Sequence, residues 1–192
     1  MEPIILVGGG GHCKSCIDVI EAEGSFKIVG IIDVPAKIGG EILGYPVMGT
    51  DDDLPFLTNQ YKYFLLTIGQ IGAPDIRIAL GKKLKEFHVE TPVIISPFAY
   101  VSRHAKIGEG TIVMHHALVN TNTVIGENCI INSKSLIEHD VTIGNNVHIA
   151  TGAIINGGVT IGSNSFVGSG AVCKQSISIP ENAFIKANSI VK

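Results

Sequence analysis

Apolar residues recur with a period of six through the second half of the chain. From Ile95 to Val191, every sixth residue is Ile or Val, with Cys173 as the one exception. The residue two positions before each of them is usually small or β-branched, as at Ala99 and Thr111. Residues two apart in a strand point to the same side, so both members of each pair should face inward. The period therefore predicts short strands around a narrow core.

A Gly or Asn often follows the repeated aliphatic residue directly, for example at Gly108, Asn120 and Gly126. We expect these residues to supply the left-handed backbone torsions of tight corners. Three short strands then form a coil of about 18 residues, and about five such coils stack in register as parallel sheets. This arrangement resembles the left-handed β-helix of hexapeptide repeats, which we predict for residues 94–192.

The first half of the chain alternates short apolar runs with amphipathic segments. We predict strands at residues 4–7, 28–32 and 63–68, helices at 12–22 and 74–87, and a last strand at 93–95 that runs into the repeat. The alternation of strands and helices is typical of a small open parallel sheet. We therefore assign residues 1–93 to an α/β, Rossmann-like domain that precedes the β-helix.

Charge and hydropathy exclude two classes of partner. The chain has 14 Lys plus Arg and 17 Asp plus Glu, a net charge of -3, which leaves no surplus to neutralise a nucleic-acid backbone. The mean hydropathy of +0.37 would fit a membrane protein. However, polar residues interrupt every apolar run long before the roughly 18 residues that a membrane span needs. We expect neither nucleic-acid binding nor membrane insertion.

The cysteines bear on the cellular compartment. The chain has four of them, Cys13, Cys16, Cys129 and Cys173, and it begins without the basic segment and long apolar run of a signal peptide. Both features favour a reducing, cytoplasmic compartment. The C-x-x-C spacing of Cys13 and Cys16 lacks the context of a redox or zinc motif, so we interpret the pair as two small thiols on a helix.

A glycine-rich turn at residues 8–11 separates the first predicted strand from the first predicted helix. A strand, such a turn and a helix together form an anion cradle, because the turn lets the helix N-terminal N–H groups reach a phosphate. Asp33, at the end of the second predicted strand, stands where such folds often place an acid against a ribose or base. Ser15 replaces the third Gly of a full G-x-G-x-x-G pattern, so a tight turn without a ligand is the alternative.

The whole chain resembles the bacterial sugar O/N-acetyltransferases, which comprise sialic acid O-acetyltransferases and N-acetyltransferases of nucleotide-linked amino sugars. The resemblance rests on residues 7–12, 31–33 and 67–70 with Arg77, and most specifically on residues 132–140 with His148. It implies an N-terminal domain that binds a nucleotide sugar and a left-handed β-helix acyltransferase domain that binds acetyl-CoA. It also implies a homotrimer with the acetyl-CoA cleft between neighbouring subunits.

Acetyl transfer from a thioester needs a base that takes the proton of the attacking group, and histidine suits this task. His139 lies two residues after Ile137, at a predicted corner, so its ring should project from the β-helix. Asp140 follows directly and could hold the tautomer of the ring. The repeat position alone leaves a solvated corner histidine as an equal alternative. The resemblance implies that His139 is the catalytic general base and that Asp140 orients it.

The resemblance also suggests which residues bind the two substrates. For acetyl-CoA we expect contacts from His148, which would polarise the thioester carbonyl from the facing subunit, and from Asn132, Gly157 and Gly168. For the nucleotide sugar, the glycine turn with His12 should hold the diphosphate. Asp33 and the loop of Gly69 and Gln70 should lie beside the nucleoside or sugar. The expected set is Gly9, Gly10, Gly11, His12, Asp33, Gly69 and Gln70. No metal site is expected.

Three functions are compatible with these residues. We favour acetyl-CoA-dependent N-acetylation of the amino group of a nucleotide-linked amino sugar in bacterial surface glycan biosynthesis, because an acid directly after the base resembles the amine-acetylating branch. O-acetylation of sialic acid or a related sugar is the alternative, since the Leu-Ile-Glu-His run occurs in both branches. The third is a zinc-dependent β-helix protein similar to carbonic anhydrases, using His115, His116 and a third histidine.

Overall fold

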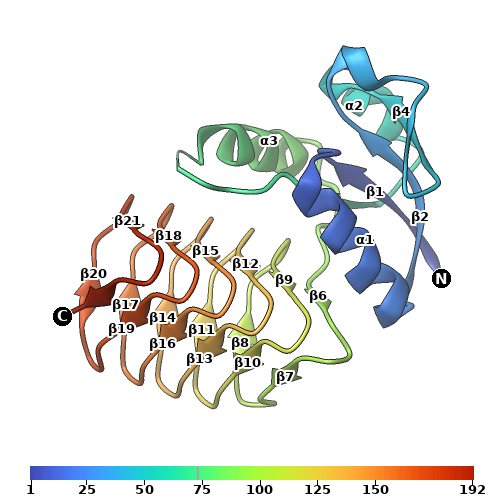
Figure 1. Cartoon of the computed structure of the whole chain (residues 1–192). Helices are drawn as coiled ribbons and strands as arrows, with labels where there is room; N and C mark the ends of the chain where they lie inside the picture. The colour runs from blue at the N-terminus through green and yellow to red at the C-terminus, as the bar shows by residue number, and fades with distance from the viewer. Residues whose placement is uncertain (73) are drawn as a thin grey trace. The chain divides into compact units, whose positions relative to one another are not determined.

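The computed structural model describes residues 1–72 and 74–192. The chain forms two compact units (Figure 1). The first unit comprises Met1–Gly69 and Asp75–Pro92, and the second comprises Gln70–Pro74 and Val93–Lys192. The expected boundary between residues 93 and 94 lies one residue after this division. The grouping of residues 70–74 with the second unit has no counterpart in the sequence analysis.

The first unit contains a five-stranded sheet with the strand order β3-β4-β2-β1-β5. All neighbouring strands are parallel except the pair β3–β4, which is antiparallel. The strands are β1 (Glu2–Val7), β2 (Phe26–Ile32), β3 (Glu41–Ile42), β4 (Tyr45–Gly49) and β5 (Tyr63–Leu66). The helices are α1 (Gly11–Glu23), α2 (Leu54–Leu57) and α3 (Asp75–Glu86), with short 3-10 helices η1 (Pro35–Lys37) and η2 (Asp51–Asp53).

Burial explains why these segments form a sheet. The side chains of Ile4 to Val7 in β1 are at most 1% exposed, as expected for a central strand covered on both faces. Helix α1 ends at Gly24, whose φ of 78° provides the left-handed C-cap that glycine adopts without strain. The predicted strands and helices of this half are confirmed, with ends that differ by at most two residues. The elements β3, β4 and α2 were not predicted, because segments of two to five residues carry too little periodicity.

The second unit is a left-handed parallel β-helix, as predicted, built from three sheets of two-residue strands that appear as stacked coils in Figure 1. We name each sheet by its first strand. The β6 sheet contains β6 (Ile94–Ile95), β9 (Ile112–Val113), β12 (Ile130–Ile131), β15 (His148–Ile149), β18 (Phe166–Val167) and β21 (Phe184–Ile185). The β7 sheet contains β7 (Tyr100–Val101), β10 (Leu118–Val119), β13 (Leu136–Ile137), β16 (Ile154–Ile155), β19 (Val172–Cys173) and β22 (Ile190–Val191). The β8 sheet contains β8 (Lys106–Ile107), β11 (Val124–Ile125), β14 (Thr142–Ile143), β17 (Thr160–Ile161) and β20 (Ser178–Ile179). The strand expected at residues 93–95 is β6, and it pairs with β9 of this unit.

The core of the β-helix contains the residues that the period of six selected. The repeated aliphatic side chains from Val113 to Ile179 are no more than 5% exposed. Small inward residues such as Ala117 and Ala153 pack against them. The hydroxyls of Thr111, Thr123 and Ser165 donate to backbone carbonyls of the following coil, as Thr111 Oγ1 does to Gly126 at 2.8 Å, and Ser135 Oγ donates to the carbonyl of Asn132 in its own coil. Each buried hydroxyl of this kind is therefore satisfied, which makes Ser and Thr acceptable in a dry core.

The corners differ from the expectation. Left-handed torsions occur at every sixth residue from Gly110 to Asn188, two positions later than predicted, and the positions include His116 and Asp140. The glycines that directly follow the aliphatic residue serve close packing instead. A Cβ atom on Gly108 would lie 2.6 Å from the carbonyl carbon of Gly126 in the following coil. The prediction about corner torsions was therefore wrong. A glycine directly after the aliphatic residue is needed because the next coil packs closely against it, and not because its own backbone is left-handed.

Among the described residues, no helix is long and apolar enough to cross a membrane.

Candidate active site

His139 and Asp140 form an exposed pair at the corner between β13 and β14. Their side chains are 50% and 55% exposed, so the ring projects from the β-helix as expected. His139 Nδ1 lies 2.7 Å from Asp140 Oδ2. An ionised carboxylate only accepts hydrogen bonds, so Nδ1 carries the proton and Nε2 keeps its lone pair. This is the tautomer that a general base needs.

The carboxylate of Asp140 has a second partner that the sequence analysis did not identify. Asn122 Nδ2 donates a hydrogen bond of 2.6 Å to Asp140 Oδ1. The hydrogen bonds from Asn122 and from His139 hold the pKa of Asp140 below its ordinary value. The carboxylate therefore stays ionised, and stays a hydrogen-bond acceptor, throughout the neutral pH range.

Gly157 lies directly against the imidazole ring of His139. A Cβ atom at this position would lie 2.8 Å from both Cε1 and Nε2 of the ring. Gly168 has a different environment, since a Cβ atom there would lie 2.8 Å from the carbonyl oxygen of Ile185 in the next coil. Gly157 therefore makes room for the ring, and Gly168 makes room for the neighbouring backbone. Their contacts with acetyl-CoA stay predictions.

His148 lies on a different face of the β-helix from His139. It points outward from the β6 sheet, as its position in β15 requires, but it is only 6% exposed. His148 Nδ1 lies 2.6 Å from the backbone carbonyl oxygen of Gln70, and Nε2 lies 3.2 Å from Asn132 Nδ2. A carbonyl only accepts, so Nδ1 donates to Gln70 and Nε2 accepts from Asn132.

Three predicted residues, Gln70, Asn132 and His148, therefore come together on the β-helix. Gln70 Nε2 also donates to the carbonyl oxygen of Asn146 at 3.0 Å, which ties its segment to the same unit. Gln70 was expected beside a nucleotide sugar, and in the structure its backbone carbonyl accepts a hydrogen bond from His148. The roles of these three residues in binding stay predictions.

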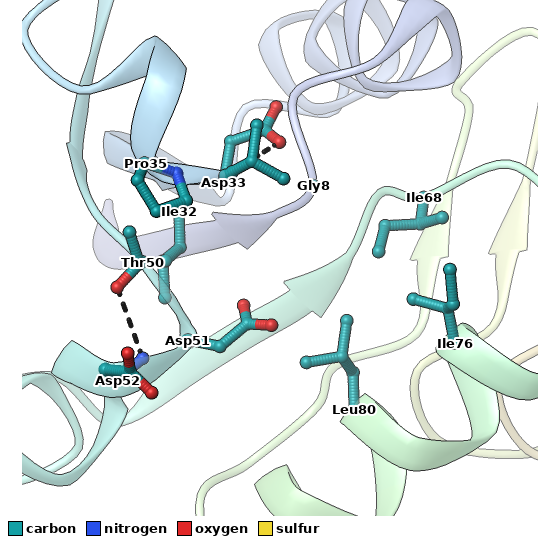
Figure 2. A pocket seen from close by; sticks show the side chains of 11 residues that line it. Gly8, Ile32, Asp33, Pro35, Thr50, Asp51, Asp52, Ile68, Ile76 and Leu80 are labelled. Atoms are coloured by element: carbon teal, nitrogen blue, oxygen red, sulfur yellow. Dashed lines mark hydrogen bonds between the residues drawn. The ribbon is translucent and has the colours of Figure 1, made fainter.

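The first unit has a cavity of about 270 Å³ at the carboxyl ends of β1, β2 and β5. In open α/β sheets, ligands bind outside this edge. Figure 2 shows Asp51, Ile68, Ile76 and Leu80 pointing toward the same open space. The cavity is lined by Gly8, Ile32, Asp33, Val34, Pro35, Thr50, Asp51, Asp52, Ile68, Ile76 and Leu80. Of the predicted substrate residues, only Asp33 is among them.

The carboxylate of Asp33 is largely engaged by its surroundings. Oδ2 accepts hydrogen bonds from the Gly9 backbone N–H at 2.8 Å and from Lys37 Nζ at 2.6 Å, and Oδ1 accepts from the Val34 N–H at 2.7 Å. Burial alone would raise the pKa of Asp33, but these hydrogen bonds, with that of Lys37 foremost, lower it below its ordinary value. Asp33 thus joins the glycine turn to the end of β2.

The glycines of the turn have different structural requirements. A Cβ atom on Gly9 would lie 2.6 Å from Asp33 Oδ2, whereas Cβ atoms on Gly10 and Gly11 would meet no described atom within 4 Å. Gly10 is also the N-cap of α1 and supplies no side-chain cap, so N–H groups of the first turn of α1 are left available to a ligand. The open space over Gly10 and Gly11 therefore suits close approach of an anion to the backbone.

His12 and Gly69, two other predicted residues, lie beside each other in the first unit. A Cβ atom on Gly69 would lie 3.3 Å from the Cβ of His12. The structure thus brings the loop after β5 to the start of α1. The cavity residues Thr50, Asp51 and Asp52 were missed, although Thr50 and Asp53 form a reciprocal capping box. A Thr followed three residues later by an acid is a recognisable helix start, and that signal could have placed a loop at this edge of the sheet.

The zinc alternative receives no support from the geometry of the part of the chain that the structure describes. No group of three or more His, Cys, Asp or Glu side chains there is arranged to hold a metal ion. His115 Nδ1 instead lies 2.6 Å from Ser96 Oγ.

Comparison with protein families divides the chain in the same way. Residues 3–84 match the family model of the PglD N-terminal domain, and residues 122–157 and 140–175 match that of the bacterial transferase hexapeptide (six repeats). UDP-N-acetylbacillosamine N-acetyltransferase of Bacillus subtilis (strain 168) is 31% identical over 118 residues, which are 59% of this chain and 52% of that protein. The alignment thus spans about half the length of this curated relative.

Several solved structures, including two acetyltransferases, resemble the entire chain. The acetyltransferase domain of PglB from Neisseria gonorrhoeae superposes with a TM-score of 0.91 at 27% identity, covering 100% of this chain and 92% of that one. A histidine variant of perosamine N-acetyltransferase from Caulobacter crescentus, in complex with CoA and GDP-perosamine, superposes with a TM-score of 0.93 at 30% identity. That match covers 100% of this chain and 89% of the relative.

Proposed function

Since the chain belongs to the family of nucleotide-sugar N-acetyltransferases, we propose that it transfers the acetyl group of acetyl-CoA to the amine of a nucleotide-linked amino sugar in bacterial surface glycan biosynthesis. The observation that carries the proposal is the pair of His139 and Asp140 on an exposed corner, with Nδ1 bonded to the carboxylate. A histidine held in this tautomer and open at Nε2 suits the removal of a proton from an attacking amine.

The proposed reaction proceeds by direct transfer. The amine nitrogen attacks the thioester carbonyl carbon and forms a C–N bond. At the same time, His139 Nε2 takes a proton from the attacking nitrogen. The C–S bond then breaks, and the sulfur of CoA leaves and receives the proton from His139. Cysteine does not serve as a nucleophile in this scheme, because Cys129 and Cys173 are fully buried and burial raises the pKa of the Cys173 thiol to about 11.

The first unit supplies the proposed site for the nucleotide sugar. The N–H groups at the start of α1 and the open backbone of Gly10 and Gly11 suit the diphosphate. The neighbouring cavity, with its apolar walls and the carboxylates of Asp33 and Asp51, suits the nucleoside. His12 and Gly69 complete the proposed contacts on this side.

We also propose that the protein is a homotrimer whose subunits pack side by side. The outward side chains of the β7 sheet form an apolar ladder of Tyr100, Leu118, Leu136, Ile154, Val172 and Ile190. The two ends of this ladder are 60% and 68% exposed. An apolar strip of this length favours association. His139 follows β13 at the edge of the same sheet, so a second subunit packed on the ladder would form one wall of an acetyl-CoA cleft, with His148, Asn132, Gly157 and Gly168 as proposed contacts.

A cytoplasmic location is part of the proposal. All four cysteines are free and buried, which is typical of a reducing compartment. The proposed reaction also consumes acetyl-CoA, which such a compartment supplies.

The test combines binding with turnover. Thermal unfolding is measured with UDP-, GDP- and dTDP-linked amino sugars, each with and without acetyl-CoA, and release of the CoA thiol is then followed for every stabilising sugar. We expect one nucleotide series to raise the melting temperature and to support thiol release that depends on the amine. Release with the hydroxyl analogue of the same sugar and none with the amine would overturn the proposal in favour of O-acetylation. Light scattering should give a mass near three times 20.3 kDa.

A further inference from the structure

Asn122 occupies the same corner position as Asp140, one coil earlier in the β-helix. Both residues have left-handed backbones, with φ of 57° and 60°. Asn122 Nδ2 donates to Asp140 Oδ1 at 2.6 Å, and Asp140 Oδ2 lies 2.7 Å from His139 Nδ1. The two oxygens of one carboxylate are thus divided between Asn122 on one side and His139 on the other.

The same corner position elsewhere in the β-helix provides a comparison. At the corners between the β8 and β6 sheets, Asn146 Nδ2 donates to Asn164 Oδ1 at 3.2 Å, and Asn164 Nδ2 donates to Asn182 Oδ1 at 3.3 Å. These bonds join neutral amides in a continuous ladder along the coils. The ladder that begins at Asn122 ends on a carboxylate instead, since the next member is Gly158, which has no side chain. The hydrogen bond from Asn122 is also shorter, as expected for a charged acceptor.

An exposed carboxylate needs such an anchor to hold a neighbouring ring. The side chain of Asp140 is 55% exposed, so water competes for its oxygens and its rotamers are not restricted by packing. Asn122 holds Oδ1 and thereby turns Oδ2 toward Nδ1 of His139. The amide N–H also stabilises the ionised carboxylate, which is the form that accepts from Nδ1.

We propose that Asn122 is a positioning residue for acetyl transfer, which fixes the Asp140 carboxylate so that His139 keeps its proton on Nδ1 and presents the Nε2 lone pair to the acceptor amine. This inference rests on the proposed function, because it gives Asn122 a role only if His139 is the base. Asn122 itself touches neither the ring of His139 nor a substrate in this scheme.

The test uses Asn122→Gly, because glycine adopts the left-handed torsions of this corner at no cost and already does so at Gly158. The matched control is Asn164→Gly, which removes an amide with the same conformation (φ of 63°) and the same type of ladder bond at a distant corner. We expect Asn122→Gly to lower kcat roughly fivefold with an unchanged KM for acetyl-CoA. The control should keep the kcat of the unmodified protein.

Two further measurements separate positioning from a structural role. In the background of Asp140→Gly, which removes the carboxylate and keeps the left-handed corner, Asn122→Gly should cause no additional loss of kcat, since its partner has been removed. By ¹⁵N NMR, the His139 ring of the unmodified protein should show one dominant tautomer with the proton on Nδ1, and Asn122→Gly should show a mixture. Equal kcat for Asn122→Gly and its control, additive losses in the double variant, or an unchanged tautomer would each overturn the inference. Absence of turnover in the unmodified protein would overturn the proposed function, and the NMR result would still decide the role of Asn122.

Discussion

His139 and His148 lie nine residues apart in the β-helix, and they differ in exposure and in hydrogen bonding. His139 stands at a corner, half exposed, with Nδ1 bonded to a carboxylate and Nε2 beside Gly157. His148 stands in the middle of a strand, 6% exposed, and both of its ring nitrogens have hydrogen-bond partners. Corner positions thus keep a side chain open for chemistry. Strand positions expose or bury an outward side chain according to what covers the sheet.

The largest expected difference comes from removing each ring. His139→Ala should lower kcat by on the order of 10² to 10⁴, the usual range for a positioned general base, with normal folding and acetyl-CoA binding. His148→Ala should lower the free energy of unfolding by about 2 kcal/mol, in addition to losing its proposed contact with acetyl-CoA, because it leaves a cavity and an unpaired Gln70 carbonyl. Steady-state kinetics and urea unfolding of both variants measure the contrast. Near-full turnover of His139→Ala from pH 6 to 9 would show that another group or water is the base.

A second contrast concerns two glycines of the β-helix. Gly157→Ala should lower kcat roughly ten- to a hundredfold, because the added methyl group displaces the His139 ring from its place. Gly168→Ala should mainly lower the melting temperature, because its methyl group meets backbone atoms of the next coil, which do not yield cheaply. Kinetics and thermal unfolding distinguish the two effects. A loss of stability in Gly157→Ala equal to that in Gly168→Ala would contradict a special relation between Gly157 and the ring.

In the first unit, Gly10 and Gly9 provide a similar contrast. A side chain on Gly10 would enter open space, whereas a side chain on Gly9 would meet neighbouring atoms. Gly10→Val should raise the KM for the nucleotide sugar about tenfold and leave that for acetyl-CoA unchanged, since its side chain enters open space at the anion cradle. Its cost in stability should be about 1 kcal/mol, for a β-branched residue at a helix N-cap. Gly9→Ala should destabilise the fold, since its Cβ meets Ile42 and Asp33. Equal rises in both KM values for Gly10→Val would indicate a purely structural turn.

The smallest expected effect is on the pH dependence of stability. The pKa of Asp140 is lowered in the folded protein, so its ionised form stabilises the fold at pH values above 3.8, the ordinary value. This contribution is lost as the pH falls through the lowered pKa of the folded state. Asp140→Asn should therefore show a slightly shallower loss of stability between pH 5 and 2 than the unmodified protein, measured by urea unfolding. If the free energy of unfolding of both proteins depends on pH in the same way, Asn122 and His139 do not stabilise the ionised carboxylate in the folded state.

Much of this architecture could be predicted from local pattern. The period of six predicted the β-helix and its core, and the corner position of His139 predicted an outward ring, because a repeat maps each position to one side of the chain. Short elements such as β3 and the residues around Thr50 were not predicted, since they have too few residues to show a period. The spacing of 18 between Asn122 and Asp140 was readable in principle, but a repeat of many Asn residues does not reveal which of them meets a carboxylate.

By itself, the sequence determined which side of the chain each residue of the β-helix occupies, and with it the exposed pair of His139 and Asp140. Only the tertiary structure decided what each outward side chain meets. Gln70 reaches His148 across 78 positions of sequence, and Gly157 lies under a ring from the preceding coil. The physical reason is that the direction of a side chain follows from local backbone geometry, whereas its burial depends on distant segments that pack against it.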